Sequence, residues 1–274
     1  MILDKNCPRT IVWIAIPRTG TNFLCSLMYH HPAITSYYEI FHPDKFYGGY
    51  QTNVPGIIDY INKKYAFNFS TDRDPQLIQW IHDHPAKLID TLLYFNPENY
   101  ISFKLFPAHL NREAIESTII RNRTIRKVLV KRDLLAAYIS HEIALKTNKW
   151  KDFDTSKAKI SISVEKFIKW LNWAEAWYRL FEEHNYIDKR ECSIINYEDI
   201  HAHQTNIDKL SYIDRFLRNI GIEFPQEYRL PSNDYIKIMS KQDKRKNIAE
   251  KIINYQDFLQ EIRDRGLDER FQYT

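Results

Sequence analysis

Residues 11–24, IVWIAIPRTGTNFL, constrain the fold of this chain more than any other stretch. The unbroken apolar run at 11–16 is rich in β-branched side chains, which predicts a short strand covered on both faces. Pro17 ends that strand because proline has no N–H group for the ladder. Gly20 permits a sharp turn, and from Asn22 onward apolar side chains recur on one side of a predicted helix.

A strand, a tight polar turn and a helix start together form an anion-binding site. The first N–H groups of a helix have no partner within it, and the helix dipole favours negative charge there. Arg18 adds a cation whose planar fork suits a phosphate or a sulfate. The alternative is an ordinary strand-to-helix turn with an exposed Arg18. The ATP-binding pattern GxxxxGK[ST] is not met, because its first glycine is missing and Arg18 precedes the turn.

Length and composition limit the class of protein. A chain of 274 residues with 44% hydrophobic residues can build one large α/β domain or two small ones. A formal net charge of +4 tolerates an anionic ligand but does not indicate a nucleic-acid partner. No apolar run approaches the roughly 20 residues that span a membrane, so we expect no transmembrane segment.

The cysteines and the N-terminus bear on the compartment. Cys7, Cys25 and Cys192 lie far apart and form no CxxC pair. This pattern favours reduced thiols rather than a disulfide framework. The first ten residues lack the apolar centre of a signal peptide. Together these features predict a cytoplasmic protein.

Strand and helix patterns alternate along the chain. Strands are expected at 100–106, 127–131 and 192–197, and a strand or extended loop at 33–43. Helices are expected at 57–67, 76–94, 111–120, 133–146, 164–181 and 206–220, and the second of these should break at Pro85. A last helix is expected to follow the basic segment 241–246 and to run through Ile262. The alternation predicts a single domain over 1–274, an α/β fold with a mostly parallel central sheet flanked by helices. Ligands in such sheets bind beyond the carboxyl ends of the strands.

Two motifs resemble the sulfotransferases that use 3′-phosphoadenosine 5′-phosphosulfate (PAPS). The first is PRTGTNFL, and the second is KVLVKRDLLAAYISHEIALKTNKW, in which Arg132 ends a strand and Ser140 follows eight residues later. The run ISHEIALKTNKW is most similar to the bacterial carbohydrate sulfotransferases, the trehalose and Nod-factor type. The resemblance implies a P-loop-NTPase-like α/β domain that does not hydrolyse nucleotides.

The resemblance also implies donor-binding residues. Arg18 would contact the 5′-phosphate and the bridging oxygen, and the turn after it would hold the same phosphate through amides and hydroxyls. Arg132 and Ser140 would bind the 3′-phosphate, and Tyr197 in NYEDI would lie beside the adenine. The remaining residues implied are Thr19, Gly20, Thr21 and Asn22 in the turn, and Lys241 and Lys246 in the late basic segment.

Sulfuryl transfer to a hydroxyl needs a base for the acceptor proton and a cation for the charge that grows on the leaving phosphate. Arg18 fits the second role. For the base, Glu39 in YYEIFH corresponds to a glutamate of the carbohydrate branch, and His42 is the alternative. This chemistry requires no metal, although the His82/His84 and His201/His203 pairs have a spacing that can serve one.

The acceptor is expected to be a hydroxyl-bearing small molecule or glycolipid, most consistent with a carbohydrate. An aromatic cluster suggests an acceptor side that suits sugar faces as well as apolar or phenolic groups, and Trp150 is a further candidate to line the donor or acceptor site. The cluster comprises Tyr37, Tyr38, Phe41, Phe46, Tyr47 and Tyr50.

The resemblance is compatible with a homodimer. Two other hypotheses are an ATP-dependent phosphotransferase of the P-loop fold and a non-catalytic nucleotide-binding relative.

Overall fold

The computed structural model describes residues 9–49, 52–150, 154–183, 192–224, 228–236, 245 and 247–267. Within these residues, five parallel strands form one sheet in the order β2-β3-β1-β4-β5. The strands are β1 (Thr10–Ile14), β2 (Ile34–Ser36), β3 (Tyr100–Leu105), β4 (Ile125–Lys131) and β5 (Cys192–Asn196). The predicted α/β class with a parallel sheet and flanking helices is therefore confirmed.

The strand predicted from the N-terminal apolar run lies at the centre of the sheet. β1 pairs with β3 on one side and with β4 on the other. Every residue of β1 is buried. Val12 and Ile14 pack into one hydrophobic core, while Ile11 and Trp13 pack into another on the opposite face. Burial on both faces explains why this strand reads as a continuous apolar run instead of an alternating one.

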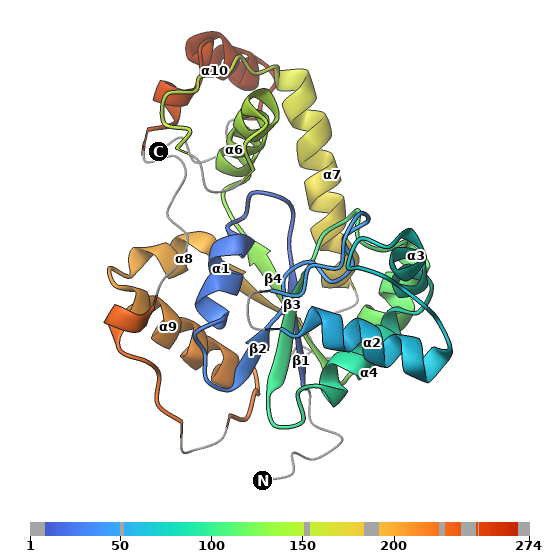
Figure 1. Ribbon diagram of the computed structural model, residues 1–274. Helices are drawn as coiled ribbons and strands as arrows, with labels where there is room; N and C mark the ends of the chain where they lie inside the picture. Colours follow the sequence, from blue (N-terminus) through green and yellow to red (C-terminus); the bar gives the residue numbers. More distant parts are fainter. Residues whose placement is uncertain are drawn as a thin grey trace.

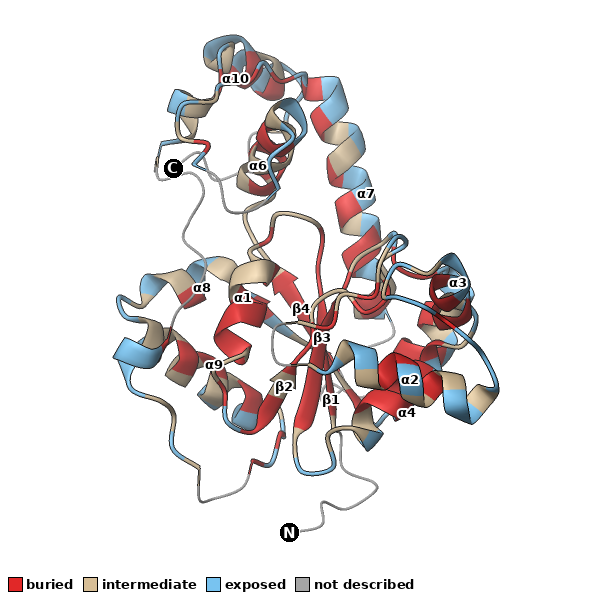
Figure 2. Cartoon of the chain, in the orientation of Figure 1, coloured by how far each residue is buried: buried red, intermediate tan, exposed pale blue. Residues whose placement is uncertain are grey.

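Helices cover both faces of the sheet (Figure 1). On one face lie α1 (Thr21–Met28), α8 (Tyr197–Ala202) and α9 (Asn206–Asn219). The other face is covered by α2 (Val54–Tyr65), α3 (Pro75–Asp83), α4 (Pro85–Tyr94), the short α5 (Arg112–Ala114) with the π-helix η1 (Ile115–Ile120), and the second half of α7 (Val164–Glu182). Red, buried positions line the sheet-facing sides of these helices in Figure 2.

A separate group of helices lies above the carboxyl ends of the strands, and we call it the cap (Figure 1). It consists of α6 (Leu134–Thr147), the first half of α7 and α10 (Tyr255–Asp264), with the 3₁₀ turn η4 (Ile248–Lys251). These elements share a third hydrophobic core, which includes Tyr138, Phe167 and Phe258. Because α7 contributes to this core and to one sheet face, it ties the cap to the sheet.

Local sequence signals account for most helix boundaries. Side chains of Asn53, Asp74, Asp133 and Ser163 each accept a hydrogen bond from a first-turn N–H group of the helix they precede. Pro85 opens α4 immediately after α3 has ended. The predicted break of 76–94 at this proline is therefore confirmed, since proline suits the first turn of a helix and disrupts its interior.

Three of the differences from the predicted elements bear on the cavity or on predicted site residues. β2 is shorter than the 33–43 segment, so Glu39 lies in the loop that follows it. The expected late helix starts only at Tyr255, after η4 and a short connection. Tyr197 does not end a strand but begins α8, with β5 ending at Asn196. The described residues also include the 3₁₀ turn η3 (Asn233–Tyr235).

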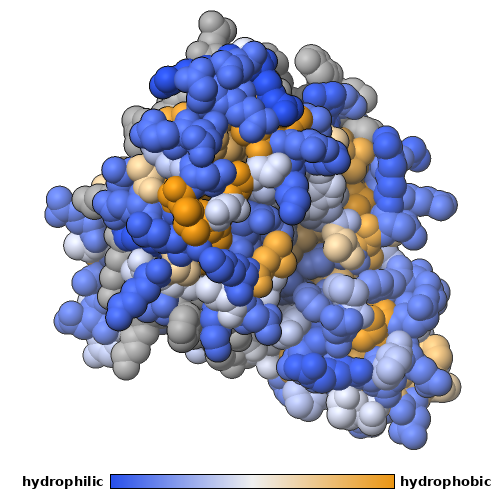
Figure 3. All heavy atoms as spheres, turned by 90° about the horizontal axis from the view of Figure 1, so that it is seen from above, coloured by the Kyte–Doolittle hydropathy of each residue, from blue (hydrophilic) through white to orange (hydrophobic). Residues whose placement is uncertain are grey.

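The surface seen from above is mostly hydrophilic, and hydrophobic residues show in small separate patches (Figure 3). Among the described helices, none is long and apolar enough to cross a bilayer. Two of the cysteines, Cys25 and Cys192, are described, and both are buried as free thiols. Burial raises the pKa of Cys25 to about 11, which keeps it protonated and chemically quiet.

Candidate functional site

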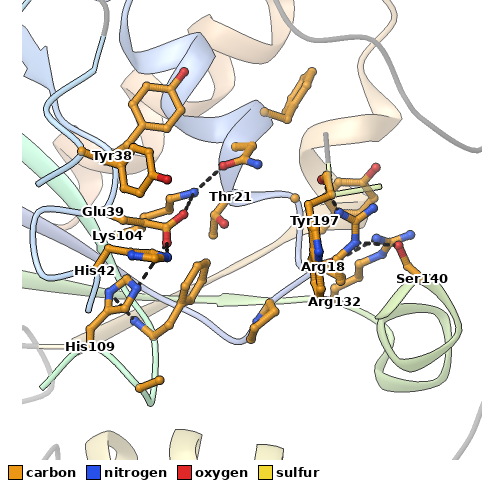
Figure 4. Close-up of a pocket in the computed structure, with 18 of the residues that line it drawn as sticks. Arg18, Thr21, Tyr38, Glu39, His42, Lys104, His109, Arg132, Ser140 and Tyr197 are labelled. Carbon is orange, nitrogen blue, oxygen red and sulfur yellow. Dashed lines mark hydrogen bonds and ion pairs between the residues drawn. The ribbon is translucent and has the colours of Figure 1, made fainter. Parts of the chain in front are cut away.

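A cavity of about 1200 Å³ lies at the carboxyl edge of the sheet. Its lining includes Arg18 and Thr21 after β1, Glu39 after β2, His109 after β3, Arg132 after β4 and Tyr197 after β5. Since β1 is the central strand, its turn separates two groups of side chains (Figure 4). We call Arg18, Arg132, Ser140 and Tyr197 the arginine half, and Tyr38, Glu39, His42, Lys104 and His109 the carboxylate half.

The turn between β1 and α1 has an unusual backbone. Arg18 and Gly20 both have positive φ, 73° and 81°. Left-handed residues in such a turn direct successive N–H groups toward one side, which forms an anion-binding concavity. In the part of the chain that the structure describes, no side chain caps α1 at Gly20, so its first-turn N–H groups face the turn without a side-chain acceptor. A Cβ on Gly20 would lie 2.3 Å from the Tyr197 ring, so this position also requires glycine for space.

Hydrogen bonds join the arginine half across three segments. The Arg18 guanidinium donates from Nε to Ser140 Oγ at 3.0 Å and from an Nη atom to the Trp150 carbonyl at 2.7 Å. Arg132 donates to the Arg18 carbonyl at 2.7 Å. The Arg132 guanidinium also lies 4.5 Å from the centre of the Tyr197 ring. The structure thus brings together residues from three distant parts of the sequence.

The charges in this half favour an anion. Burial, and next the charge of Arg132, lower the pKa of Arg18 to about 10. Two guanidinium groups that repel each other in a partly buried site gain stability when an anion lies between them. Burial also raises the pKa of Tyr197, so its hydroxyl stays neutral and adds no competing negative charge.

The carboxylate half is centred on Glu39. Lys104 Nζ lies 2.7 Å from Glu39 Oε1, and His109 Nε2 lies 3.3 Å from Oε2. His42 Nε2 is more distant, at 3.9 Å from Oε2. Burial alone would raise the pKa of Glu39, but the hydrogen bond from His109 and the Lys104 ammonium outweigh it and hold the pKa at about 2. Glu39 is therefore ionised at neutral pH.

Backbone contacts fix the tautomers of both histidines. The Nδ1 atom of His109 accepts from the Phe106 N–H at 3.3 Å, and that of His42 accepts from the Asp44 N–H at 3.1 Å. In the neutral form each ring then carries its proton on Nε2, the atom that faces Glu39. A neutral His42 consequently offers a donor rather than a base at this site. The geometry favours Glu39 over His42 as the proton acceptor.

Lys104 and His109 belong to the site but were not predicted from the sequence. Lys104 lies on β3 with its side chain only 1% exposed, and it also donates to the Asn22 side-chain oxygen. A lysine within the apolar strand YISFKLF was the available signal, because buried lysines are rare unless paired. His109 had no such local signal, since its contact with Glu39 spans 70 positions.

Of the predicted donor-binding residues in the turn, Thr19 alone does not line the cavity. Thr19 is fully buried, and its hydroxyl donates to the Ile16 carbonyl at 2.8 Å, so its side chain is occupied within the turn. Thr21 lines the cavity, as does Asn22, whose side chain faces Lys104. The late basic residues Lys241 and Lys246 lie outside the described residues. Among the described residues of the late segment, Lys251 of η4 lines the cavity.

The predicted aromatic cluster divides between the cavity and the core. Tyr38, Phe46 and Tyr47 line the cavity. Tyr37 and Phe41 are instead buried in the core of one sheet face, so their expected place at the acceptor side is wrong. Tyr50 lies outside the described residues. Trp150 lines the cavity as predicted, and so does Trp173 of α7.

The histidine pairs do not form a common site. His82 Nε2 lies 3.2 Å from the Phe41 carbonyl. His201 lines the cavity between the rings of Phe23 and Tyr197, with ring centres 4.4 and 4.1 Å away. In the part of the chain that the structure describes, no three His, Cys, Asp or Glu residues cluster in a way that could hold a metal ion.

The cavity therefore combines a turn and two guanidinium groups suited to phosphate with an ionised carboxylate on the other side of that turn. Comparison with known proteins finds no family model that matches this chain and no curated protein with significant similarity.

Proposed function

We propose that this chain transfers a sulfuryl group from PAPS to a hydroxyl group of an acceptor, using a P-loop-NTPase-like sulfotransferase fold. The observation that carries the proposal is the position of the anion-binding turn at Arg18–Gly20, between the arginine half and Glu39. A donor bound along the arginine half would present its reactive end at the turn. A hydroxyl activated by Glu39 would then approach from the opposite side.

The arginine half suits a nucleotide with two phosphate groups. Arg18, the free N–H groups at the start of α1 and Thr21 would hold the 5′-phosphate. Arg132 and Ser140 would bind the 3′-phosphate, with Tyr197 beside the adenine. The depressed pKa of Arg18 supports this assignment, because an anion between Arg18 and Arg132 would relieve their repulsion.

The size of the cavity supports a reaction between two substrates. Pockets for one small ligand usually measure about 300–1000 Å³. The volume here, about 1200 Å³, leaves room for an acceptor beside a nucleotide. The cavity also reaches the end of every strand in the described sheet, so both ligands would share one continuous space.

PAPS would supply an activated sulfuryl group. The chain would position the donor and the acceptor and would stabilise the charge that develops during transfer. The acceptor oxygen bonds to sulfur while the bond from sulfur to the bridging phosphate oxygen breaks, and adenosine 3′,5′-bisphosphate leaves. Glu39 takes the acceptor proton. Arg18 and the turn amides stabilise the charge that develops on the phosphate. The reaction needs no covalent intermediate with the protein.

The carboxylate half suits a carbohydrate acceptor. Tyr38 and Tyr47 offer ring faces, while His42 and Asp72 offer polar groups beside them in the same lining. Sugars present both an apolar face and hydroxyl groups, so mixed aromatic and polar walls fit them. A glycolipid would place its sugar at the same position.

The proposal is tested with purified protein and ³⁵S-labelled PAPS. A panel of sugars, glycolipids and phenols is offered, and labelled product is measured for the wild type and for Glu39→Gln. We expect transfer to at least one sugar-bearing acceptor and a large loss in the variant. A parallel reaction with ATP and Mg²⁺ tests phosphoryl transfer. Phosphoryl transfer without sulfuryl transfer would replace this proposal with the phosphotransferase hypothesis.

A further inference from the structure

Glu39 has two close partners, a histidine held in place by a backbone contact and a lysine with a flexible side chain. His109 is a fixed partner, because its Nδ1 accepts from the Phe106 N–H and its Nε2 therefore stays a donor toward Glu39. Lys104 is a cation on a flexible stem, and it touches Glu39 through a single oxygen at 2.7 Å. Only the second partner can change its contact without a change in the backbone.

Lys104 also reaches the anion-binding turn. Its ammonium donates to the side-chain oxygen of Asn22, which belongs to the first turn of α1. The rings of Tyr38 and Phe106 lie 5.4 and 5.3 Å from Nζ and bound its space on two sides. The same ammonium thus lies between Glu39 and the helix start at which a phosphate or sulfate would bind (Figure 4).

An ionised carboxylate that holds a lysine and a histidine is a poor proton acceptor. A general base works best when its pKa lies near the working pH. The pKa of Glu39 is held at about 2, far below that range. The contacts with Lys104 and His109 therefore stabilise Glu39 in a state that does not suit its proposed role.

We propose that Lys104 is a transferable partner, which leaves Glu39 for the anionic group of the donor when PAPS binds and thereby turns Glu39 into an active base. This inference rests on the proposed function and assigns a regulatory step to the same site. His109 keeps its hydrogen bond throughout and acts as the positioning residue for Glu39. The acceptor hydroxyl then meets a competent base only when the donor is present.

The groups around Glu39 single out Lys104 for this role. Among the described residues, the titratable groups that act on Glu39 are Lys104 on β3, His109 after it, His42 on the loop of Glu39, and Cys25 on α1. Of these four, Lys104 is the one with a described hydrogen bond to the residues of the turn. An anion at the turn would attract its charge. Its departure would remove the lowering effect of the ammonium, so that burial raises the pKa of Glu39 against the His109 hydrogen bond alone.

The test measures protons taken up as PAPS binds without acceptor. Calorimetric titrations at pH 5 in buffers of different ionisation enthalpy give the number of protons per PAPS bound. Proton changes on the phosphates occur equally in wild type and Glu39→Gln, so the difference between them reports Glu39. We expect the wild type to take up a measurable fraction of a proton more per PAPS bound than Glu39→Gln, because loss of the Lys104 contact raises the pKa of Glu39.

Lys104→Met identifies the cause of the uptake. This substitution keeps the length of the side chain and removes the charge, so Glu39 would lack its cation before PAPS binds. The extra uptake, measured against the double variant Lys104→Met/Glu39→Gln, should shrink to a small fraction of the wild-type value. Thermal unfolding verifies that the variants fold, and the comparison of wild type with Glu39→Gln stands independently of Lys104→Met.

Each outcome has a distinct meaning. Binding of PAPS with equal proton uptake in wild type and Glu39→Gln would overturn the transfer of Lys104 while leaving the proposed function intact. Undiminished extra uptake in Lys104→Met would show that the charge of PAPS acts on Glu39 directly, which also overturns it. Failure of the wild type to bind PAPS would overturn the proposed function and, with it, the proposed transfer of Lys104.

Discussion

The guanidinium of Arg132 donates a hydrogen bond of 2.7 Å to the backbone carbonyl of Arg18. This contact links the residue after β4 to the turn after β1 and sets Arg132 over the ring of Tyr197. The arginine half is therefore a connected unit whose members depend on one another.

Arg132→Ala should weaken binding of adenosine 3′,5′-bisphosphate by about 10- to 100-fold, since a charge-assisted contact contributes roughly 1.5–3 kcal/mol. Binding of ADP, which lacks the 3′-phosphate, should change much less. Arg132→Lys serves as the matched control and should give an intermediate loss, because it keeps the charge but not the planar fork. Equal losses for both nucleotides would contradict the assignment of Arg132 to the 3′-phosphate.

Gly20→Ala should reduce both stability and nucleotide affinity. Gly20 has a φ of 81°, and an added Cβ would approach the Tyr197 ring to 2.3 Å. The control is Gly266→Ala, where φ is 63° but no atom lies within 4 Å, so it reports the backbone cost alone. We expect about 1 kcal/mol for the control and more for Gly20→Ala, measured by denaturant unfolding.

The double variant Gly20→Ala/Tyr197→Ala separates the two costs at the turn. Removal of the ring should restore the part of the stability that the clash removes. If the double variant is as unstable as the sum of the single variants, the contact with Tyr197 does not explain the need for glycine.

Glu39→Gln should lower kcat by about 10²- to 10⁴-fold, the range for loss of a general base. His42→Asn should change kcat far less, because His42 Nδ1 is occupied by the Asp44 N–H and its Nε2 carries the proton. Steady-state rates at saturating PAPS and acceptor provide the comparison. A loss in His42→Asn as large as in Glu39→Gln would make His42 the base.

Glu39 should also make stability depend on pH in acid. Its folded pKa, about 2, lies below the ordinary value of 4.5. Its contribution to the free energy of unfolding is thus fully present above pH 4.5 and is lost as pH falls toward 2. Glu39→Gln should lose less stability than the wild type across this window, as measured by urea unfolding at several pH values.

A second carboxylate keeps part of this acid sensitivity in the variant. Burial alone would raise the pKa of Asp214, but bonds with His31, Tyr228 and Arg218 hold it at about 2. The unfolding curves of Glu39→Gln should therefore retain a shallower dependence on pH. An identical dependence in wild type and Glu39→Gln would contradict the depressed pKa of Glu39.

Local patterns were sufficient for the central strand, its turn and most helices. The run at 11–16, Gly20 and Pro85 each act through neighbouring residues, so their effects can be inferred from the sequence alone. The pairing of Glu39 with Lys104 could not be inferred in this way. It depends on β2 lying next to β3 in the sheet, and the order of strands is a property of the whole fold.

The cap also shows that local sequence patterns do not reveal which elements a helix packs against. The apolar stripe of α7 predicts a buried face, yet it does not reveal that the first half packs in the cap and the second half on the sheet. The hydroxyl of Thr19 is a smaller example. The motif suggests a ligand contact, whereas the fold brings the Ile16 carbonyl within 2.8 Å and engages the hydroxyl there.

The most direct measurement is a calorimetric titration of the wild type with adenosine 3′,5′-bisphosphate, compared with ADP and 5′-AMP under identical conditions. A site built from Arg18, Arg132 and Ser140 predicts that the nucleotide with the 3′-phosphate binds at least about tenfold more tightly than the others, a difference of about 1.4 kcal/mol. Equal affinities, or tighter binding of ADP, would contradict a PAPS-dependent sulfotransferase and direct the search toward ATP.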